Sequence, residues 1–325
     1  MAIIDNGSSV FVANLHTGNA TDDTDITTGI AANFIWFKQY NATRGLLNFD
    51  SVRGVQKQLN SNSNALSYTE ATSLQAFNSD GFTVGTSNSC NGVNGGLYVT
   101  WNFKITSGVF DIQTWTGTGS NRTISHNLSA VPTLFIVKEI TGSVNDWTVY
   151  YGDPTDALQL NEVNSTSDAA TRWNDTAPTA SVFSLGSGSV GNRNNSTYIG
   201  YFFADSSVSK ATTYRGNGTA QQFIHLGFKP AWVMIKGVSG SGSNENWSIY
   251  DNARTPNNVI NSVVYANANN AQGTSSDIDF LSNGVCIRRA TGLLNDAAVT
   301  YVILAMAEEP FVSSEDNGSI PATGK

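Results

Sequence analysis

Residues 227–254 read GFKPAWVMIKGVSGSGSNENWSIYDNAR, and much of this pattern already occurs in residues 130–153, AVPTLFIVKEITGSVNDWTVYYGD. Both stretches have a proline, an apolar run that ends in lysine, a turn with Gly and Ser, and a tryptophan that opens an alternating segment ending in tyrosine. Alternation of apolar and polar residues is typical of a half-buried β-strand. The two stretches therefore predict the same pair of strands at two places in one chain.

The apolar run that ends in lysine occurs three times, as IWFK, FIVK and VMIK, and its lysines, Lys38, Lys138 and Lys236, stand 100 and 98 residues apart. Two further landmarks have nearly the same period in the same order. They are the glycines Gly18, Gly117 and Gly216, and the apolar strands that begin at Tyr98, Tyr198 and Tyr301. A repeat of this length is too long for one turn of a solenoid and matches a common domain size. The chain is therefore predicted to be a triplication.

The polar residues are mainly Ser, Thr, Asn and Gly, and only 13% of residues are charged, which favours strands and turns over helices. Asp80-Gly81 and Asn283-Gly284 are typical of hairpin turns with positive φ, and residues 301–307 predict a strand covered on both faces. We predict an all-β chain of three tandem β-sandwich, jelly-roll-like repeats of about 100 residues, each with its own core, that together form a short rod. The predicted boundaries are 1–106, 107–207 and 208–312, with a C-terminal tail at 313–325.

The composition of the chain argues against several classes of partner and site. The net charge is −8 and the only basic cluster is the Arg288-Arg289 pair, which argues against binding to nucleic acid. No apolar run is long enough to cross a membrane and no export signal opens the sequence, so no membrane insertion is expected. Cys90 and Cys286 are the only cysteines, so we expect no disulfide framework and no cysteine-based metal site.

The histidines do not predict a metal or catalytic site. His126 and His225 are 99 residues apart and are expected at equivalent places in different repeats, while His16 lies in the first repeat. A zinc site needs three or four converging donors, so structural roles are favoured for all three. With three dispersed histidines and no G-x-S-x-G elbow, a Ser/His/Asp triad has no support either.

Each acidic motif has a functional and a structural interpretation. Asp22, Asp23 and Asp25 loosely resemble an oxygen-rich calcium loop, but they lack the glycine and terminal glutamate of an EF-hand, so a solvated acidic loop is favoured and calcium binding stays open. The pairs Asp277 with Asp279 and Glu308 with Glu309 could serve a glycosidase only if the two carboxyl groups faced each other. Neither pair supports an enzyme.

Two other motifs are interpreted as structural. GSGSVG at residues 186–191 fits G-x-G-x-x-G, yet it leads into a strand-like stretch with no helix to receive a pyrophosphate. Trp147 and Trp247 recur at one point of an alternating strand, which favours the core over sugar stacking, and Trp173 is left open. We therefore predict no catalytic, cofactor-binding or metal-binding residues and no cofactor.

Several whole phrases resemble a domain of unassigned function found in structural and tail-fibre-like virion proteins of marine tailed bacteriophages. The phrases are GFKPAWVMIKG, NWSIYDNAR, DIDFLSNG and YVILAMAEEPFVSSE in the third repeat, WNDTAPTASVFSLG and STYIGYFFAD in the second, and DSVRG and YVTWNFK in the first. They are spread over nearly the whole chain. The resemblance implies a virion component and carries no catalytic residues with it.

The resemblance implies a role on the particle surface, after assembly in the host cytoplasm. Because the chain begins almost at once with repeat sequence, we expect a capsid decoration or head-fibre protein that reinforces the shell or mediates weak adhesion. A receptor-binding tail fibre is the first alternative, and a carbohydrate-binding or depolymerising protein is the second. The implied partners are the major capsid protein or tail components, host cell-surface polysaccharide, and further copies of the chain.

Overall fold

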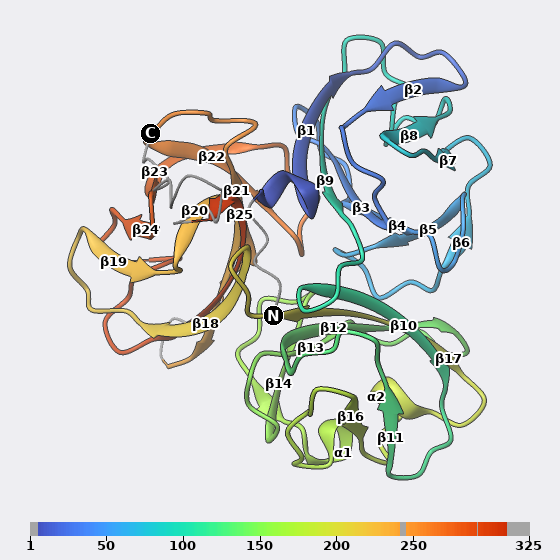
Figure 1. Cartoon of the computed structure of the whole chain (residues 1–325), viewed down its shortest axis with the longest axis vertical. Helices are drawn as coiled ribbons and strands as arrows, with labels where there is room; N and C mark the ends of the chain where they lie inside the picture. The colour runs from blue at the N-terminus through green and yellow to red at the C-terminus, as the bar shows by residue number, and fades with distance from the viewer. Residues whose placement is uncertain (1–5, 241–244, 291, 311–325) are drawn as a thin grey trace, which may run out of the picture.

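The computed structural model describes residues 6–240, 245–290 and 292–310, and within them the chain is almost entirely β-strand (Figure 1). This confirms the all-β prediction. For description, unit 1 denotes residues 6–106, unit 2 residues 107–207 and unit 3 residues 208–310. The boundaries predicted at 106 and 207 fall in the connections that lead from β9 to β10 and from β17 to β18. The predicted tail at 313–325 lies outside the described residues.

Unit 1 begins with a 3-10 helix, Gly7–Ser9, and contains two antiparallel sheets. The larger has the strand order β1 (Phe11–Thr17), β9 (Leu97–Phe103), β3 (Phe34–Gln39), β4 (Leu47–Asp50), β5 (Lys57–Asn60) and β6 (Tyr68–Thr69). The smaller has the order β2 (Thr24–Thr27), β8 (Gly81–Val84) and β7 (Leu74–Phe77).

Unit 2 repeats this order of strands. Its larger sheet is β10 (Phe110–Thr116), β17 (Thr197–Ala204), β12 (Pro132–Thr141), β13 (Thr148–Tyr150), β14 (Asp156–Gln159) and β15 (Ser167–Asp168). Its smaller sheet pairs β11 (Arg122–Ser125) with β16 (Val182–Leu185). Two short helices, α1 (Ala170–Trp173) and α2 (Ser189–Asn192), flank β16.

Unit 3 joins the two sheets into one of eight strands, which curves almost into a barrel. The order is β18 (Ser209–Arg215), β25 (Thr300–Pro310), β20 (Phe228–Ser239), β21 (Ser248–Asp251), β22 (Ile260–Tyr265), β23 (Gly273–Leu281), β24 (Gly284–Ile287) and β19 (Gln222–His225). The long strand β23 pairs with β22 at one end and with β24 at the other. It thereby connects the two sheets that are separate in units 1 and 2.

Both predicted Asx-Gly hairpins are present, but their glycines are required for a different reason. Gly81 and Gly284 begin strands β8 and β24 and neither has a positive φ. A Cβ atom at Gly81 would lie 2.0 Å from the carbonyl oxygen of Ile26, and one at Gly284 would lie 2.1 Å from that of Ile224. The glycines therefore allow close approach of the neighbouring strand rather than a left-handed turn.

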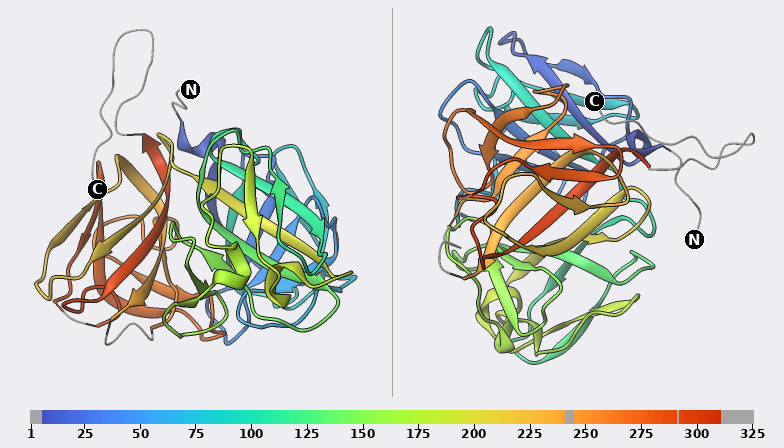
Figure 2. Two further views of the ribbon diagram at one scale, coloured as in Figure 1. Left: turned by 90° about the horizontal axis from the view of Figure 1, so that it is seen from below. Right: turned by 90° about the vertical axis from the view of Figure 1, so that its left-hand side faces the viewer.

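The three units surround one common core instead of forming a rod. Figure 1 shows three lobes around a centre, and the views of Figure 2 agree. A single cluster of buried side chains includes members from every unit, among them Phe103, Tyr201 and Trp232. The rod is therefore wrong as a prediction, and the separate core for each repeat holds only in part: units 1 and 2 each have a further buried cluster of their own, whereas the buried side chains of unit 3 belong to the common core.

The reason lies in strands that are buried on both faces. All six residues of β3, Phe34–Gln39, are buried, as are the last six of β9. In unit 1, one face of the larger sheet packs on the smaller sheet through residues such as Phe37 and Phe82, while the other face carries Trp36 and Trp101 into the common core. Apolar side chains on both faces of a sheet need two covers, and the second cover here is the other two units.

Candidate functional site

The lysine that ends each apolar run connects its unit to another unit. Lys38 Nζ donates to the carbonyl oxygen of Asn269 at 3.0 Å, Lys138 Nζ to that of Asn64 at 2.8 Å, and Lys236 Nζ to that of Val163 at 2.9 Å. Unit 1 thus binds unit 3, unit 2 binds unit 1 and unit 3 binds unit 2. The three contacts close a ring.

The lysine ammonium groups carry their charge in a buried environment. All three side chains are buried, and burial lowers the pKa of Lys38, Lys138 and Lys236 to about 8 each. At neutral pH they remain protonated and can donate to the carbonyl groups around them. The sequence showed that these lysines recur with the period of the repeat. Nothing in the residues around them indicated that they donate hydrogen bonds to another unit.

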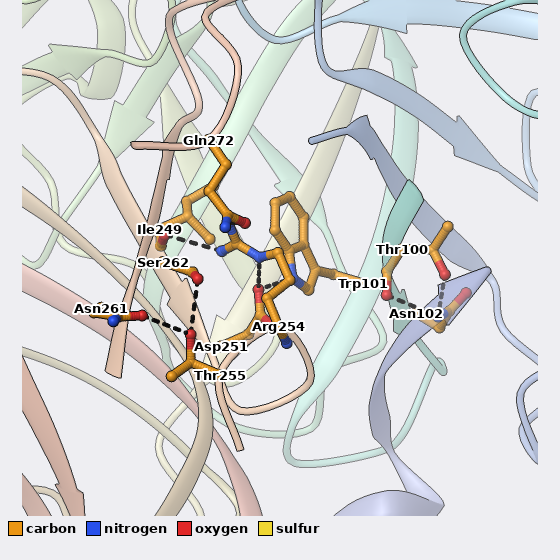
Figure 3. A network of polar contacts seen from close by, with 10 residues as sticks. All are labelled: Thr100, Trp101, Asn102, Ile249, Asp251, Arg254, Thr255, Asn261, Ser262 and Gln272. Atoms are coloured by element: carbon orange, nitrogen blue, oxygen red, sulfur yellow. Dashed lines mark hydrogen bonds and ion pairs between the residues drawn. The ribbon is translucent and has the colours of Figure 1, made fainter. Parts of the chain in front are cut away.

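A second contact between units is built on an aspartate and an arginine three residues further on. In unit 3, Asp251 and Arg254 form a buried ion pair with an N–O distance of 2.7 Å, and the indole nitrogen of Trp101 in unit 1 donates to Asp251 at 3.1 Å (Figure 3). The Arg254 guanidinium lies over the Trp101 ring, and it also donates to Gln272 and to the carbonyl oxygen of Ile249.

Unit 1 has the same arrangement toward unit 2. Asp50 and Arg53 form a buried ion pair, and the hydroxyl of Tyr201 donates to Asp50 Oδ2 at 2.8 Å. Arg53 also donates to Ser67 and to the carbonyl oxygen of Asn48. The phrases DSVR and DNAR therefore mark the same contact at two interfaces.

The third interface, between units 2 and 3, lacks this ion pair. Phe49, Tyr150 and Tyr250 occupy the same place in the strand pairing, and the residue after each is Asp50, Tyr151 or Asp251. Three positions beyond Tyr151 stands Pro154 in place of the arginine. The opposing position, held by Trp101 and Tyr201 elsewhere, is Leu304 in unit 3.

A groove of about 660 Å³ lies where the ion pair is missing. It is lined from unit 2 by residues that include Tyr151, Asp153 and Asp156, and from unit 3 by residues that include Thr212 and Ser239. A corresponding cavity between units 1 and 2 measures about 260 Å³ and is lined by Arg53, Lys57, Ser67, Ile140 and Thr141. We refer to them as the large groove and the small groove.

The electrostatics of the two grooves differ in sign. Asp156 is the first residue of β14, and Lys57 is the first residue of the equivalent strand β5. The large groove therefore has a carboxylate at the position where the small groove has an ammonium group. Burial, together with the carboxylates of Asp156 and Asp153, raises the pKa of Tyr151 well above its usual value. The Tyr151 hydroxyl therefore stays protonated and can donate a hydrogen bond.

The candidate histidines lie apart from one another. His16 Nε2 contacts the carbonyl oxygen of Cys90 at 2.8 Å, and the ring stacks on Tyr98. His126 Nε2 contacts the carbonyl oxygen of Thr179 at 3.1 Å, whereas His225 is exposed at the end of β19. Ile124 and Ile224 correspond in the strand pairing, so His225 matches Ser125 and not His126, contrary to the prediction.

The acidic candidates do not converge. Asp22 and Asp23 are exposed in the turn before β2, and Asp25 on β2 accepts a hydrogen bond from Thr83. Asp277 is buried and accepts from Tyr250, Ser275 and Arg289, Asp279 pairs with Arg288, and Glu308 pairs with Lys229. The side chain of Glu309 lies outside the described ones. Within 6–240, 245–290 and 292–310, no group of three or more His, Cys, Asp or Glu residues is placed to hold a metal ion.

The remaining motifs have structural surroundings. Trp147, Trp173 and Trp247 are all buried, and Trp147 and Trp247 donate to carbonyl oxygens of the neighbouring unit, at Asn60 and Gln159. The GSGSVG motif lies between strands β16 and β17, where the short helix α2 is interrupted by non-helical dihedral angles. Both cysteines are free. No helix in the described part of the chain is long and apolar enough to cross a membrane.

The chain was compared with known protein families. A family of domains of unknown function, DUF7483, matches residues 6–310, so the chain belongs to this family. No curated protein matches the chain.

Proposed function

We propose that this member of the DUF7483 family is a non-catalytic structural protein on the surface of a bacteriophage particle. Its role there is that of a capsid decoration or head-fibre protein, which reinforces the shell or mediates weak adhesion. The phrases quoted above, which resemble virion proteins of marine tailed phages, support the phage origin. As part of the same proposal, the three units are tandem jelly-roll-like β-sandwich repeats derived from one ancestral unit.

The observation that carries the proposal is the closed ring of three units around one core. Each unit donates a lysine to a second unit and receives one from the third. No unit can move away without exposing apolar side chains of the common core and breaking buried polar contacts. Such a body resists local opening, which suits a component that must keep its shape on an exposed surface.

The surface composition supports display in many copies. The chain has a net charge of −8, and its polar residues are mainly uncharged amides and hydroxyls. A net charge of this size keeps a small protein soluble at high local concentration.

The test is the number of copies per particle, measured by quantitative mass spectrometry of purified virions against the major capsid protein. A copy number that is a large and constant fraction of the capsid protein supports decoration. A small multiple of the rotational symmetry of the tail supports the tail-fibre alternative instead. Absence from the particle overturns the virion proposal.

The large groove favours carbohydrate binding as a second candidate function. Pockets of 300–1,000 Å³ are the usual size of small-molecule sites, and the large groove is within this range at about 660 Å³. Incubation with host-surface polysaccharide separates binding from depolymerisation. Binding without new reducing ends supports an adhesin, whereas new reducing ends contradict the non-catalytic proposal.

A further inference from the structure

We propose that the large groove, between units 2 and 3, binds a short neutral or amino-substituted oligosaccharide. This inference deepens the adhesive role proposed above and rests on that role only for the biological source of the sugar. Whether purified protein binds the sugar is independent of whether the protein is part of a virion.

The groove is open because of specific residue changes. At the other two interfaces, an arginine fixed by an aspartate occupies the corresponding place, as Arg53 and Arg254 do. At the interface of units 2 and 3, Tyr151 and Pro154 stand at those positions, and neither can form the ion pair. The volume accordingly rises from about 260 Å³ in the small groove to about 660 Å³ in the large one.

The lining offers the groups that bind sugar hydroxyls. Asp153 and Asp156 are half-buried carboxylates. Asp153 Oδ1 accepts from Thr155 and Asp156 Oδ2 from Tyr151, so the other oxygen of each carboxylate is the acceptor offered to a sugar hydroxyl. The hydroxyls of further lining residues can both donate and accept. These residues are Thr212, Thr213, Ser239 and Thr300, whereas the Thr133 hydroxyl, also in the lining, already donates to Asp205.

An aromatic side chain in the groove supplies an apolar surface. Tyr151 lines the groove and is only half-buried, so part of the side chain is accessible to a ligand. An amphipathic aromatic ring with a polar end suits a pyranose, which has an apolar ring face and a polar rim. Val131, Val238 and Pro132 add further apolar surface to the lining.

Charge selects between classes of saccharide. Among the residues that the structure describes, the lining contains two aspartates and no lysine, arginine or histidine. Lys210, on the adjacent strand β18, is paired with Asp205 and so adds no net positive charge nearby. A sulfated or uronic acid polymer would meet like charge here, whereas a neutral sugar would not and an amino sugar would be attracted.

The experiment uses two matched substitutions in the full chain. Ser239 and Thr141 are exposed last residues of β20 and β12, each three positions after the lysine, and they line the large and the small groove. Ser239→Trp fills the large groove, and Thr141→Trp is the control at the small groove. The probes are neutral, amino and acidic oligosaccharides on an array, followed by calorimetric titration with the saccharides that bind.

We expect neutral or amino saccharides to bind the native protein, Ser239→Trp to weaken binding at least about tenfold, and Thr141→Trp to leave it unchanged. Asp156→Lys, which installs the residue of the small groove, should also abolish binding of amino sugars. Binding of acidic saccharides alone, equal loss in the two tryptophan variants, binding of Ca²⁺ without any saccharide, or no binding at all would each overturn the inference. A virion that contains the protein but does not bind sugar would refute only this inference.

Discussion

The indole nitrogen of Trp101 donates a hydrogen bond of 3.1 Å to Asp251, a residue that lies 150 positions further along the chain and in another unit. Tyr201 makes the corresponding contact with Asp50, 151 positions earlier, at 2.8 Å. Both contacts are buried and both acceptors are also held by an arginine. These pairs add a specific polar contact to two of the three interfaces between units.

Removing one buried hydroxyl should weaken the whole molecule measurably. Tyr201→Phe deletes the donor to Asp50 at little cost in volume, and we expect a loss of about 1–3 kcal/mol in the free energy of unfolding. Urea denaturation measures the change. Tyr151→Phe is the control, because the Tyr151 hydroxyl is 3.5 Å from its acceptor Asp156 and only half-buried. Equal effects of the two substitutions would contradict the assigned role of Tyr201.

The ion pair at Asp251 should show strong coupling between its partners. Arg254→Met leaves a buried carboxylate with only Trp101 and backbone donors, and we expect destabilisation of about 3–5 kcal/mol. Adding Asp251→Asn should recover part of that loss, since the uncompensated charge is then gone. A double-mutant cycle measured by denaturant unfolding gives the coupling energy. Strictly additive effects would show that the pair is not a functional unit.

The buried lysines predict an unusual dependence of stability on pH. Their pKa of about 8 in the folded protein is lower than the usual 10.5, so between these values the unfolded chain binds more protons than the folded one. Stability contributed by the lysines therefore rises with pH above 8, by at most about 1.4 kcal/mol per pH unit for each lysine.

This effect is best measured between pH 7.5 and 9. Burial raises the pKa of Cys90 and of buried tyrosines such as Tyr214, and these groups lower stability once the pH exceeds their usual values of 9.0 and 10.0. Lys138→Met should reduce the slope of the free energy of unfolding against pH by about a third, because one of three equivalent lysines is removed. Denaturant midpoints across this range provide the measurement, and a slope unchanged by the substitution would contradict the assignment.

The common core predicts that the three units unfold together. Phe103 packs against Phe11 and Phe34 of its own unit, Phe110 and Phe203 of unit 2 and Trp232 of unit 3. Phe103→Ala should destabilise the protein by about 3–5 kcal/mol and lower hydrogen-exchange protection in strands of all units. Phe82→Ala, inside the separate cluster of unit 1, is the comparison. Loss of protection confined to unit 1 in the Phe103 variant would refute a shared core.

Much of the local structure could be predicted from periodicity alone. The spacing of the lysines, glycines and tyrosines predicted a triplication. The alternation around Trp147 and Trp247 predicted core positions in a strand; both side chains are buried, but each tryptophan lies directly before its strand, β13 or β21. Strand content follows from local alternation and turn residues, so a linear sequence is sufficient to reveal it. The continuous apolar run after Tyr301 likewise indicated a strand covered on both faces.

The large groove could not be predicted from the sequence, although the residue changes that open it can be recognised once the structure is known. Aligned by strand register, DSVR, YGDP and DNAR show that unit 2 has neither member of the ion pair. That loss acquires a meaning only when the partner unit is known, since Asp50 contacts unit 2 and Asp251 contacts unit 1.

The sequence by itself determined the strands, the period of the repeat and which faces are apolar, because these depend on residues close together in the chain. Only the tertiary structure decided that the units form a ring and not a rod. A strand with two apolar faces must be covered twice, but nothing local specifies whether the second cover comes from its own unit or from another. The ring supplies that cover from residues such as Trp232 and Tyr201, and it leaves the large groove open where Tyr151 and Pro154 replace the ion pair.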